Sequence, residues 1–311
     1  MNLQKDNRLE NSVVWLTGGS GFIGSHLSKK LIATGTKKIF LLSNKNTSRP
    51  SLTQFDDQID RIEINYQDMR HLNWLLNNAR IAKPAYLIMA GWGSVGDPDS
   101  ILHQSSNVTS TTNLFNAVPK EELRKAIFFG SIDEYGKRFG RIEESHVSVL
   151  PISSYAIGKS IAARKLEILA KQSRISMQHC LISNVYGPNQ RDETLLPQMK
   201  KATHFEFRGE SYYRDYIYVG DLTKILTTLL TSDCSGRLNI GSGKTTHCFD
   251  FARKAWALMG KNPKNLTFIH PEVQDESLMK CFNISRLRSQ LPKDMTICGI
   301  EFGLAKTVLT L

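Results

Sequence analysis

The stretch VVWLTGGSGFIG, residues 13–24, decides how the chain folds. It joins an apolar run to a loop with almost no side chains, and a helical apolar pattern follows over residues 23–33. Gly18, Gly21 and Gly24 therefore stand between an expected strand and an expected helix. In that setting the glycines permit a tight turn, close approach of phosphates and close helix packing. The loop predicts backbone N–H groups, at the positive end of a helix, that bind the pyrophosphate of a dinucleotide.

The alternative interpretation of the glycine loop is a flexible turn. That interpretation is disfavoured because the predicted strand, the glycine spacing and the predicted helix coincide.

The first half of the chain alternates short strand-like runs with amphipathic helical patterns. Strands are predicted at 13–16, 39–42, 62–65, 86–90, 126–129 and 178–183, and helices at 23–33, at 108–118 and from Ser153 and Ser154 onward. Thr34 and Gly35 predict the end of the first helix. The alternation predicts an α/β fold with a Rossmann-like, doubly wound parallel sheet covered by helices on both faces.

After Pro188 the segments become shorter and more polar, with loops such as GPNQRDET and RGESYYRDY. We therefore expect residues 1–183 to form the dinucleotide-binding domain, which also receives part of 215–240. Residues 184–311 are expected to form mainly a smaller C-terminal α/β lobe that binds substrate.

Composition narrows the class of protein. The 311 residues are 41% hydrophobic and 22% charged, which is typical of a globular protein. The five cysteines are far apart and lack CxxC spacing, so we expect neither a disulfide framework nor a metal site, and a cytoplasmic location. The longest apolar stretches are too short to span a membrane, and the N-terminus has no export signal. We therefore expect no membrane partner.

The net charge of +11 comes from 40 basic and 29 acidic residues. The basic residues stand in short pairs, such as Lys29-Lys30 and Lys200-Lys201, with no arginine-rich arm. This pattern favours solvated faces and an anion-binding pocket over a nucleic-acid partner.

The end of the second predicted strand bears on the cofactor. Dinucleotide sites usually place an acidic residue there to bind the ribose diol. Here Ser43, Asn44 and Lys45 follow the strand, and Arg49 is close behind. A hydroxyl and nearby cations favour a 2′-phosphate, so NADP(H) is the expected cofactor and NAD(H) the alternative. Ser43 as an ordinary loop residue is the other interpretation.

Three side chains form a candidate catalytic group. Tyr155 and Lys159 are four residues apart and share one helix face. A neighbouring ammonium favours the phenolate and would draw the tyrosine pKa toward a useful range. Ser131 follows the strand at 126–129, where ligand-facing residues of parallel sheets lie. Its hydroxyl is expected to bond the substrate oxygen beside Tyr155.

Several motifs in order resemble the extended short-chain dehydrogenase/reductase family, also called the NAD-dependent epimerase/dehydratase family. These are TGGSGFIG, SIDEYG, the Tyr-x-x-x-Lys pair, NVYGPNQ and RDYIYVGDL, and the similarity runs from Val13 to a helix around 301–308. The resemblance implies an enzyme that moves a hydride between a nucleotide sugar, often at C4, and a nicotinamide. A homodimer is also typical of the family.

The resemblance also implies roles for single residues. The catalytic residues would be Ser131, Tyr155 and Lys159, and no metal is implied. The cofactor-binding residues would be Gly18, Gly21, Phe22, Ile23, Gly24, Ser43, Asn44, Lys45, Asp68, Met69, Ala90, Gly91, Asn107, Tyr155 and Lys159, with Asp68 and Met69 at the adenine. The substrate-binding residues would be Trp92, Ser131, Asp133, Asn184 and Arg214, with Arg214 at the diphosphate, because a guanidinium suits phosphate oxygens.

Departures from the family pattern guide the choice of reaction. Ser43 stands where the family usually has an acidic residue, and Leu181 stands where many members have an arginine. Ile132 stands where 4,6-dehydratases have an aspartate that donates a proton. Asp133, the next residue, is still suited to act as a base. We therefore predict NADPH-dependent reduction of an NDP-4-keto-(deoxy)hexose at C4, in bacterial-type surface-sugar or deoxysugar biosynthesis. The alternatives are an NDP-sugar 4-epimerase or, less favoured, a 4,6-dehydratase with tightly bound NAD. A non-catalytic dinucleotide-binding interaction protein is the remote alternative.

Overall fold

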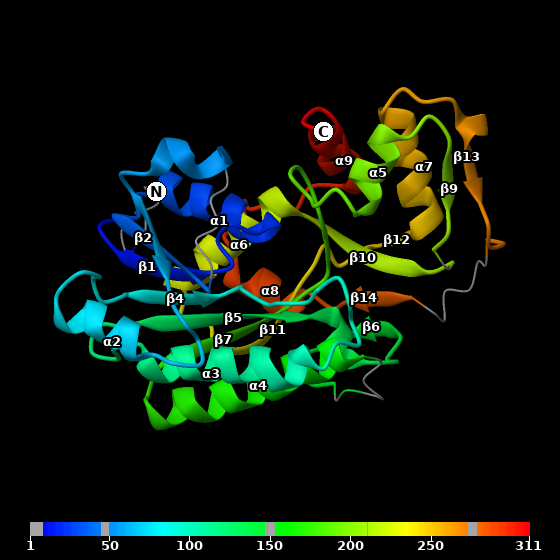
Figure 1. Cartoon of the computed structure of the whole chain (residues 1–311). Helices are drawn as coiled ribbons and strands as arrows, with labels where there is room; N and C mark the ends of the chain where they lie inside the picture. The colour runs from blue at the N-terminus through cyan, green and yellow to red at the C-terminus, as the bar shows by residue number, and fades with distance from the viewer. Residues whose placement is uncertain (1–8, 45–49, 147, 149–152, 210, 273–278) are drawn as a thin grey trace. The chain divides into compact units, whose positions relative to one another are not determined.

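The structure, a computed structural model (Figure 1), describes residues 9–44, 50–146, 148, 153–209, 211–272 and 279–311. The chain divides into two compact units. Unit 1 comprises Met1–Lys137, Ser148–Leu181 and Thr223–Leu238, and unit 2 comprises Arg138–Val147, Ile182–Leu222 and Asn239–Leu311.

Unit 1 is built on a seven-stranded parallel sheet with the order β11-β7-β5-β4-β1-β2-β3. The strands are β1 (Val13–Thr17), β2 (Lys38–Ser43), β3 (Ile59–Glu63), β4 (Tyr86–Met89), β5 (Lys125–Ser131), β7 (Ser176–Ile182) and β11 (Gly236–Ile240). Thr17 pairs with Leu42 on one side and with Met89 on the other, so three strands end at the same edge. The strand order reverses between β1 and β4, which is where ligands bind in such sheets.

Helices cover both faces of this sheet, with α3 and α4 on one face and α1 and α6 on the other (Figure 1). The helices are α1 (Phe22–Ala33), α2 (Arg70–Asn77), α3 (Val108–Ala117), α4 (Ser154–Gln172) and α6 (Val219–Thr231). Local capping sets their ends. The Ser153 hydroxyl accepts a hydrogen bond from the Ala156 amide at 3.2 Å at the start of α4. Gly35, with φ +88°, follows α1 as expected of a helix stop.

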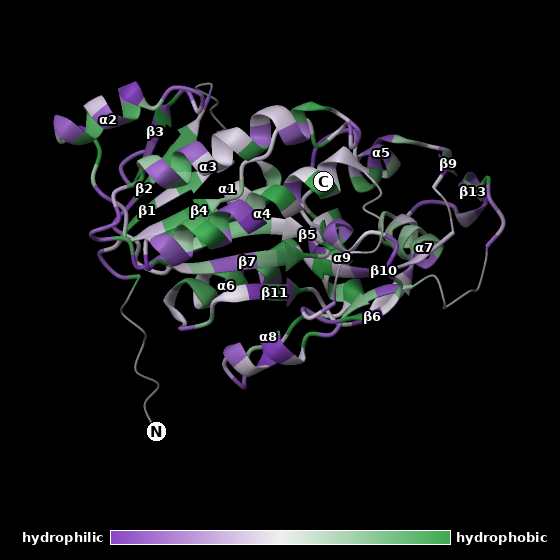
Figure 2. Cartoon of the chain, turned by 90° about the horizontal axis from the view of Figure 1, so that it is seen from below, coloured by the Kyte–Doolittle hydropathy of each residue, from purple (hydrophilic) through white to green (hydrophobic). Residues whose placement is uncertain are grey.

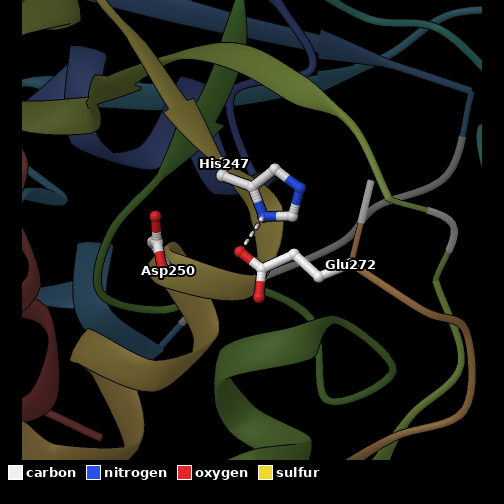
Figure 3. A group of neighbouring side chains, drawn as sticks. All are labelled: His247, Asp250 and Glu272. Carbon is white, nitrogen blue, oxygen red and sulfur yellow. Dashed lines mark ion pairs between the residues drawn. The ribbon is translucent and has the colours of Figure 1, made fainter. Parts of the chain in front are cut away.

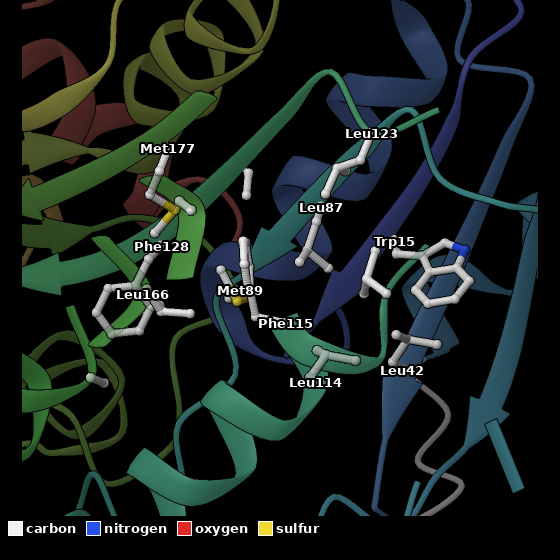
Figure 4. Packing of buried hydrophobic residues seen from close by; sticks show 14 of the residues in the cluster. Trp15, Leu42, Leu87, Met89, Leu114, Phe115, Leu123, Phe128, Leu166 and Met177 are labelled. Carbon is white, nitrogen blue, oxygen red and sulfur yellow. The ribbon is translucent and has the colours of Figure 1, made fainter. Parts of the chain in front are cut away.

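The core of unit 1 lies between the sheet and helices α2, α3 and α4 (Figure 4). Alternate strand residues point into it, among them Trp15, Phe40 and Leu87, and helix α4 contributes Leu166. Both faces of the central strands are buried, which is why these strands read as continuous apolar runs in the sequence. Figure 2 shows the same apolar strands beneath helices with polar outer faces.

Unit 2 is smaller and built from short strands. Its main sheet has the order β12-β10-β14-β6, with β8 paired to β10, and β13 pairs with β9. The strands are β6 (Gly140–Ile142), β8 (Asn184–Tyr186), β9 (Phe205–Phe207), β10 (Tyr213–Tyr218), β12 (Thr245–His247), β13 (Leu266–Phe268) and β14 (Lys280–Phe282); the helices are α5 (Leu195–Lys201), α7 (Cys248–Leu258), α8 (Ser285–Gln290) and α9 (Ile300–Val308). An aromatic core that includes Tyr186, Phe249 and Trp256 holds this unit together.

The predicted Rossmann-like fold is confirmed, with differences in detail. The strand expected at 62–65 is β3, which begins earlier at Ile59 because Ile59 pairs with Ile39 on β2. Helix α2 and a π-helical segment, His103–Asn107, were not expected. Within the described residues, no helix is both long and apolar enough to cross a membrane.

Candidate active site

The glycine loop places helix α1 directly behind strand β1. Gly21 is the N-cap of α1, and the Ser25 amide donates to the Gly21 carbonyl at 3.0 Å. The amides of Phe22, Ile23 and Gly24 precede this bond, so they have no acceptor inside the helix. They stand at the positive end of the helix, which suits an anion. The geometry fits the predicted pyrophosphate site.

The loop is packed too tightly for any side chain at two of its glycines. Gly18 has φ +70°, and a Cβ atom there would lie 2.8 Å from the Gly91 Cα. A Cβ atom on Gly24 would overlap the Gly18 carbonyl oxygen. Both obstacles are backbone, which cannot rotate away. The glycines are therefore required by packing as well as by phosphate access.

A cavity of about 350 Å³ lies in unit 1 at the carboxyl ends of β1, β2 and β4. It is lined by Thr17, Gly18, Ser20, Leu42, Ser43, Asn44, Tyr66, Met89, Gly91, Trp92, Gly93, Ser106, Asn107, Ser110, Thr111 and Leu114. Six residues predicted from the sequence are thus brought together, namely Gly18, Ser43, Asn44, Gly91, Trp92 and Asn107. No carboxylate is among these lining residues, and Lys45 lies outside the described part of the chain.

Polar side chains hold the floor of this cavity. The Thr17 hydroxyl accepts from the Gly91 amide at 2.9 Å and ties the end of β1 to the residues after β4. Ala90 is half-buried beside it. Asn107 is the N-cap residue of α3, and its side chain bonds both the amide and the carbonyl of Gly93 at 3.1 Å. The loop after β4 is therefore fixed on both sides.

Asp68 and Met69, the predicted adenine pair, are not among the described residues that line the cavity. Asp68 binds the Arg70 guanidinium through both carboxylate oxygens, at 2.5–2.9 Å, and this bond lowers the pKa of Asp68. Met69 packs against the core of unit 1. Instead, Tyr66 lines the cavity, and its hydroxyl donates to the Leu42 carbonyl at 2.8 Å. Tyr66 stands just two residues before Asp68, so the same motif could have indicated it.

The proposed catalytic residues lie together in unit 1. Ser131 is the last residue of β5 and the N-cap of the 3₁₀ helix η3 (Ile132–Tyr135). Tyr155 and Lys159 lie one turn apart on α4, with the Lys159 Nζ 5.8 Å from the centre of the Tyr155 ring. Ser131 neighbours Tyr155 as a hydrogen-bonding group and lowers its pKa. The Asp133 Oδ2 accepts from the Ser131 hydroxyl at 3.3 Å, so all four groups converge.

Burial dominates the acid–base properties of this group. Burial, with a smaller effect from Asp133, raises the pKa of Tyr155 well above its ordinary value, and Ser131 acts in the opposite direction. Burial also lowers the pKa of Lys159 to about 7, with Glu134 acting in the opposite direction. Both shifts favour the uncharged form, because a charged group loses its water when it is buried. The prediction that a neighbouring ammonium draws the Tyr155 pKa toward a useful range stays a prediction.

Trp92 and His103 enclose the lysine. The Trp92 indole N–H donates to the His103 Nδ1 at 3.0 Å, so His103 must carry its proton on Nε2, which donates to the Asp97 carbonyl at 2.8 Å. The Lys159 Nζ lies 4.2 Å from the centre of the Trp92 ring, and Nζ donates to the Phe129 carbonyl at 2.7 Å. No sequence signal predicted His103, which is fully buried.

The other two predicted substrate residues lie in unit 2, on neighbouring strands. Asn184 begins β8, and its side chain donates to the Asp215 carbonyl at 3.1 Å. Arg214 lies on β10, with its guanidinium 4.0 Å from the centre of the Tyr212 ring. Asp215 between them is buried and accepts hydrogen bonds from Ser242, Gly243 and Phe282. This strand is thus firmly held.

A group of possible metal ligands, His247, Asp250 and Glu272, also lies in unit 2 (Figure 3). Arg253 already binds both carboxylates, Asp250 at 3.0 Å and Glu272 at 2.6 Å. The His247 Nδ1 accepts from the Phe249 amide, and its Nε2 bonds the Ser211 hydroxyl. An ion-pair network therefore accounts for the group, and we assign it no metal.

Comparison with known proteins shows the family of this chain. The model of the family described as "NAD dependent epimerase/dehydratase family" matches residues 14–241. The chain belongs to the NAD-dependent epimerase/dehydratase family. The predicted resemblance to this family, of the extended short-chain dehydrogenase/reductase type, is confirmed, and its members are enzymes.

Individual relatives in this family are distant. An ADP-L-glycero-D-manno-heptose-6-epimerase of Brachyspira hyodysenteriae is 25% identical over 78% of this chain and 79% of its own. A putative UDP-glucose 4-epimerase of Methanocaldococcus jannaschii is 27% identical over 75% and 78%. Among solved structures, dTDP-glucose 4,6-dehydratase from Bacillus anthracis in complex with NAD has a TM-score of 0.81 at 20% identity, over 96% of each chain. At that identity the structural likeness shows the fold alone.

The packing of the glycine loop yields a prediction. Replacing Gly24→Ala forces a methyl group against the Gly18 carbonyl, so the first turn of α1 must shift. We expect the Kd for NAD(H) or NADP(H), measured by nicotinamide fluorescence, to rise at least about tenfold. The matched control is Gly96→Ala, where a Cβ atom meets nothing within 4 Å. Equal affinity in the two variants would contradict the assigned dinucleotide site.

Proposed function

We propose that this protein is a nucleotide-sugar oxidoreductase that uses Ser131, Tyr155 and Lys159. The observation that carries the proposal is the meeting of these three side chains in unit 1, which also holds the cavity at the carboxyl ends of β1, β2 and β4. Relatives and structural neighbours named as nucleotide-sugar epimerases and dehydratases support the substrate class. The half-buried Tyr155 and the buried Lys159, one helical turn apart, favour this over a non-catalytic protein.

A bound nicotinamide dinucleotide would supply the hydride chemistry. The amides of Phe22, Ile23 and Gly24 would hold its pyrophosphate, and Ser43 and Asn44 would meet its adenosine ribose. Tyr155 would donate a proton to the sugar oxygen as that oxygen gains negative charge. Ser131 would hold the same oxygen through its hydroxyl, and the Lys159 ammonium would stabilise the phenolate left on Tyr155.

Unit 2 would bind the nucleotide part of the substrate. Arg214 offers a planar guanidinium that suits two phosphate oxygens at once. Its stacking on Tyr212 and the hydrogen bond of Nη1 to the Tyr213 carbonyl, at 3.1 Å, restrict its motion. Asn184, on the adjacent strand, would contact sugar or phosphate. The net charge of +11 further favours a polyanionic substrate.

We propose reduction of a 4-keto sugar at C4 with NADPH as the leading reaction. The raised pKa of Tyr155 favours the phenol, the form that protonates a developing alkoxide. The described residues that line the cavity include no carboxylate to repel a 2′-phosphate. Dehydration is less favoured because Ile132 cannot deliver a proton to a leaving hydroxyl, although Asp133 stands within reach of Ser131.

A 4-epimerase that retains NAD(H) is the second candidate. It is favoured by the putative UDP-glucose 4-epimerase among the relatives and by the neighbouring structures solved with NAD. Such an enzyme would use the same three side chains and would turn the sugar between two transfers. The two candidates differ in whether the dinucleotide leaves after each cycle.

The acid–base role of Tyr155 is tested by Tyr155→Phe. This change keeps the ring against His103 but removes the only proton assigned to the sugar oxygen. We expect kcat to fall by about a hundredfold to ten-thousandfold while the Kd for dinucleotide changes less than about threefold. The measurement is steady-state nicotinamide absorbance with NDP-4-keto sugars, together with calorimetric binding. Full activity in the variant would exclude the role.

The cofactor preference is tested by Ser43→Asp. A carboxylate at this position in the cavity lining would repel a 2′-phosphate but would accept hydrogen bonds from a ribose diol. We expect the Kd for NADPH to rise about tenfold relative to that for NADH, because like charges would then meet. Ser43→Ala serves as the neutral control. An equal change for both cofactors would contradict the assignment.

The two candidate reactions are separated by what the purified protein carries. The protein is purified without added cofactor and denatured, and any nicotinamide nucleotide released is identified and counted. Little release, with saturable NADPH binding afterwards, is the result expected of the reductase. Near-stoichiometric NAD(H) would instead favour the epimerase.

A further inference from the structure

A buried carboxylate lies directly behind the catalytic group. Glu134 in η3 is only 3% exposed. Its Oε1 accepts from the Ser131 amide at 2.9 Å and from the His179 Nε2 at 3.2 Å, and its Oε2 accepts from the Ser160 hydroxyl at 3.4 Å. These partners come from the end of β5, from β7 and from α4. Glu134 therefore joins the elements that carry Ser131 and Lys159.

The surroundings are shaped to admit this carboxylate. A Cβ atom on Gly130 would overlap both the Glu134 Oε1 and the His179 Nε2, so a residue with a side chain cannot stand there. His179 is 3% exposed, and its Nδ1 is buried without a partner among the described residues. His179 therefore offers Glu134 its Nε2–H and makes no second bond. A buried polar pair of this kind costs free energy that its hydrogen bonds only partly offset, so we consider a functional reason for it.

We propose that Glu134, held by His179, is a positioning residue: its bond to the Ser131 amide fixes the serine, and its buried carboxylate places a negative charge behind the end of β5, where the Phe129 carbonyl binds the Lys159 ammonium. The proposal rests on the function proposed above, because it assigns Lys159 a charge needed in turnover. Nothing in the roles of Ser131, Tyr155 and Lys159 themselves accounts for a fourth, fully buried acid.

The balance of charges around Lys159 gives the proposal a direction. The titratable groups that surround the lysine and its tyrosine are Tyr155 on α4, Asp133 and Glu134 on η3, His179 on β7 and His103 in the π-helical segment. The aromatic rings of Trp92 and Phe128 fill the remaining space. Burial pushes the lysine toward its neutral form, and Glu134 opposes this. Removal of that charge is therefore expected to lower the pKa of Lys159 further.

The test is Glu134→Gln, which keeps the shape. The amide oxygen can still accept from the Ser131 amide, and the amide nitrogen can donate to the Ser160 hydroxyl, so mainly the charge is lost. The Lys159 Nζ is titrated by NMR in ¹⁵N-lysine-labelled protein, with the signal assigned by Lys159→Met. We expect the midpoint of the Lys159 titration to fall by about one pH unit. The alkaline limb of the pH profile of kcat/KM should move down by the same amount. Activity should therefore be about tenfold lower at high pH and unchanged at low pH.

The matched control is Glu167→Gln, which removes the same charge from the outer face of α4, where Glu167 pairs with Arg164. This control should leave unchanged both the Lys159 midpoint in the NMR titration and the midpoint of the alkaline limb of kcat/KM. If Glu134→Gln does not fold, His179→Leu is the second test. This change removes a hydrogen-bond donor that stabilises the charged form of the Glu134 carboxylate. We therefore expect the Lys159 midpoint to shift in the same direction by a smaller amount. A Lys159 midpoint that stays unchanged, or activity lost equally at all pH values, would overturn the proposal.

The two proposals fail separately. The NMR titration needs no substrate, so a shifted Lys159 midpoint in a protein that turns over no nucleotide sugar would reject the proposed function alone. Normal turnover with an unshifted midpoint would reject the role of Glu134 alone.

Discussion

The absence of side chains where strand β1 meets helix α1 is the constraint on which the rest of the site depends. Gly18 lies against the Gly91 backbone, and Gly24 lies against the Gly18 carbonyl. Because no Cβ atom separates them, the first amides of α1 stand at the edge where β1, β2 and β4 end together. That edge is also where the strand order reverses, so the cavity opens at the same place. A longer side chain at either position would separate the anion site from the cavity.

Buried charged side chains are the second feature that organises the structure. Four of them lie where two elements of the fold meet. Lys125 is buried at the start of β5 and donates to the Leu229 and Ser232 carbonyls at the end of α6, where a cation is favoured by the helix dipole. Asp215 accepts from the Ser242 and Gly243 amides and orders the loop after β11. Glu134 and Lys159 follow the same pattern beside Ser131. Since an unpaired buried charge is costly, each of these groups fixes the geometry of its neighbours.

Burial also modifies what single residues imply. A tyrosine next to a lysine is expected to lose its proton more easily. In the structure the rings of Trp92 and Phe128 lie against the Lys159 ammonium, and the His103 ring packs edge-on against Tyr155. Loss of water raises the pKa of Tyr155 and lowers that of Lys159. The Asp68 carboxylate is paired with Arg70, two residues on, and its expected contact with adenine stays a prediction.

The sequence by itself determined the elements whose signals are local. The strand–glycine–helix pattern, the Ser153 cap and the four-residue spacing of Tyr155 and Lys159 each depend on residues close together in the chain, so the Rossmann-like sheet and the helix that carries the catalytic pair could be predicted. Only the tertiary structure decided that Tyr66 lines the cavity, that His103 locks Trp92, and that Glu134 meets His179 across 45 residues of sequence. These contacts join segments distant in the chain, and no periodicity or spacing encodes them, because they arise only when the packed core brings the segments together and excludes water.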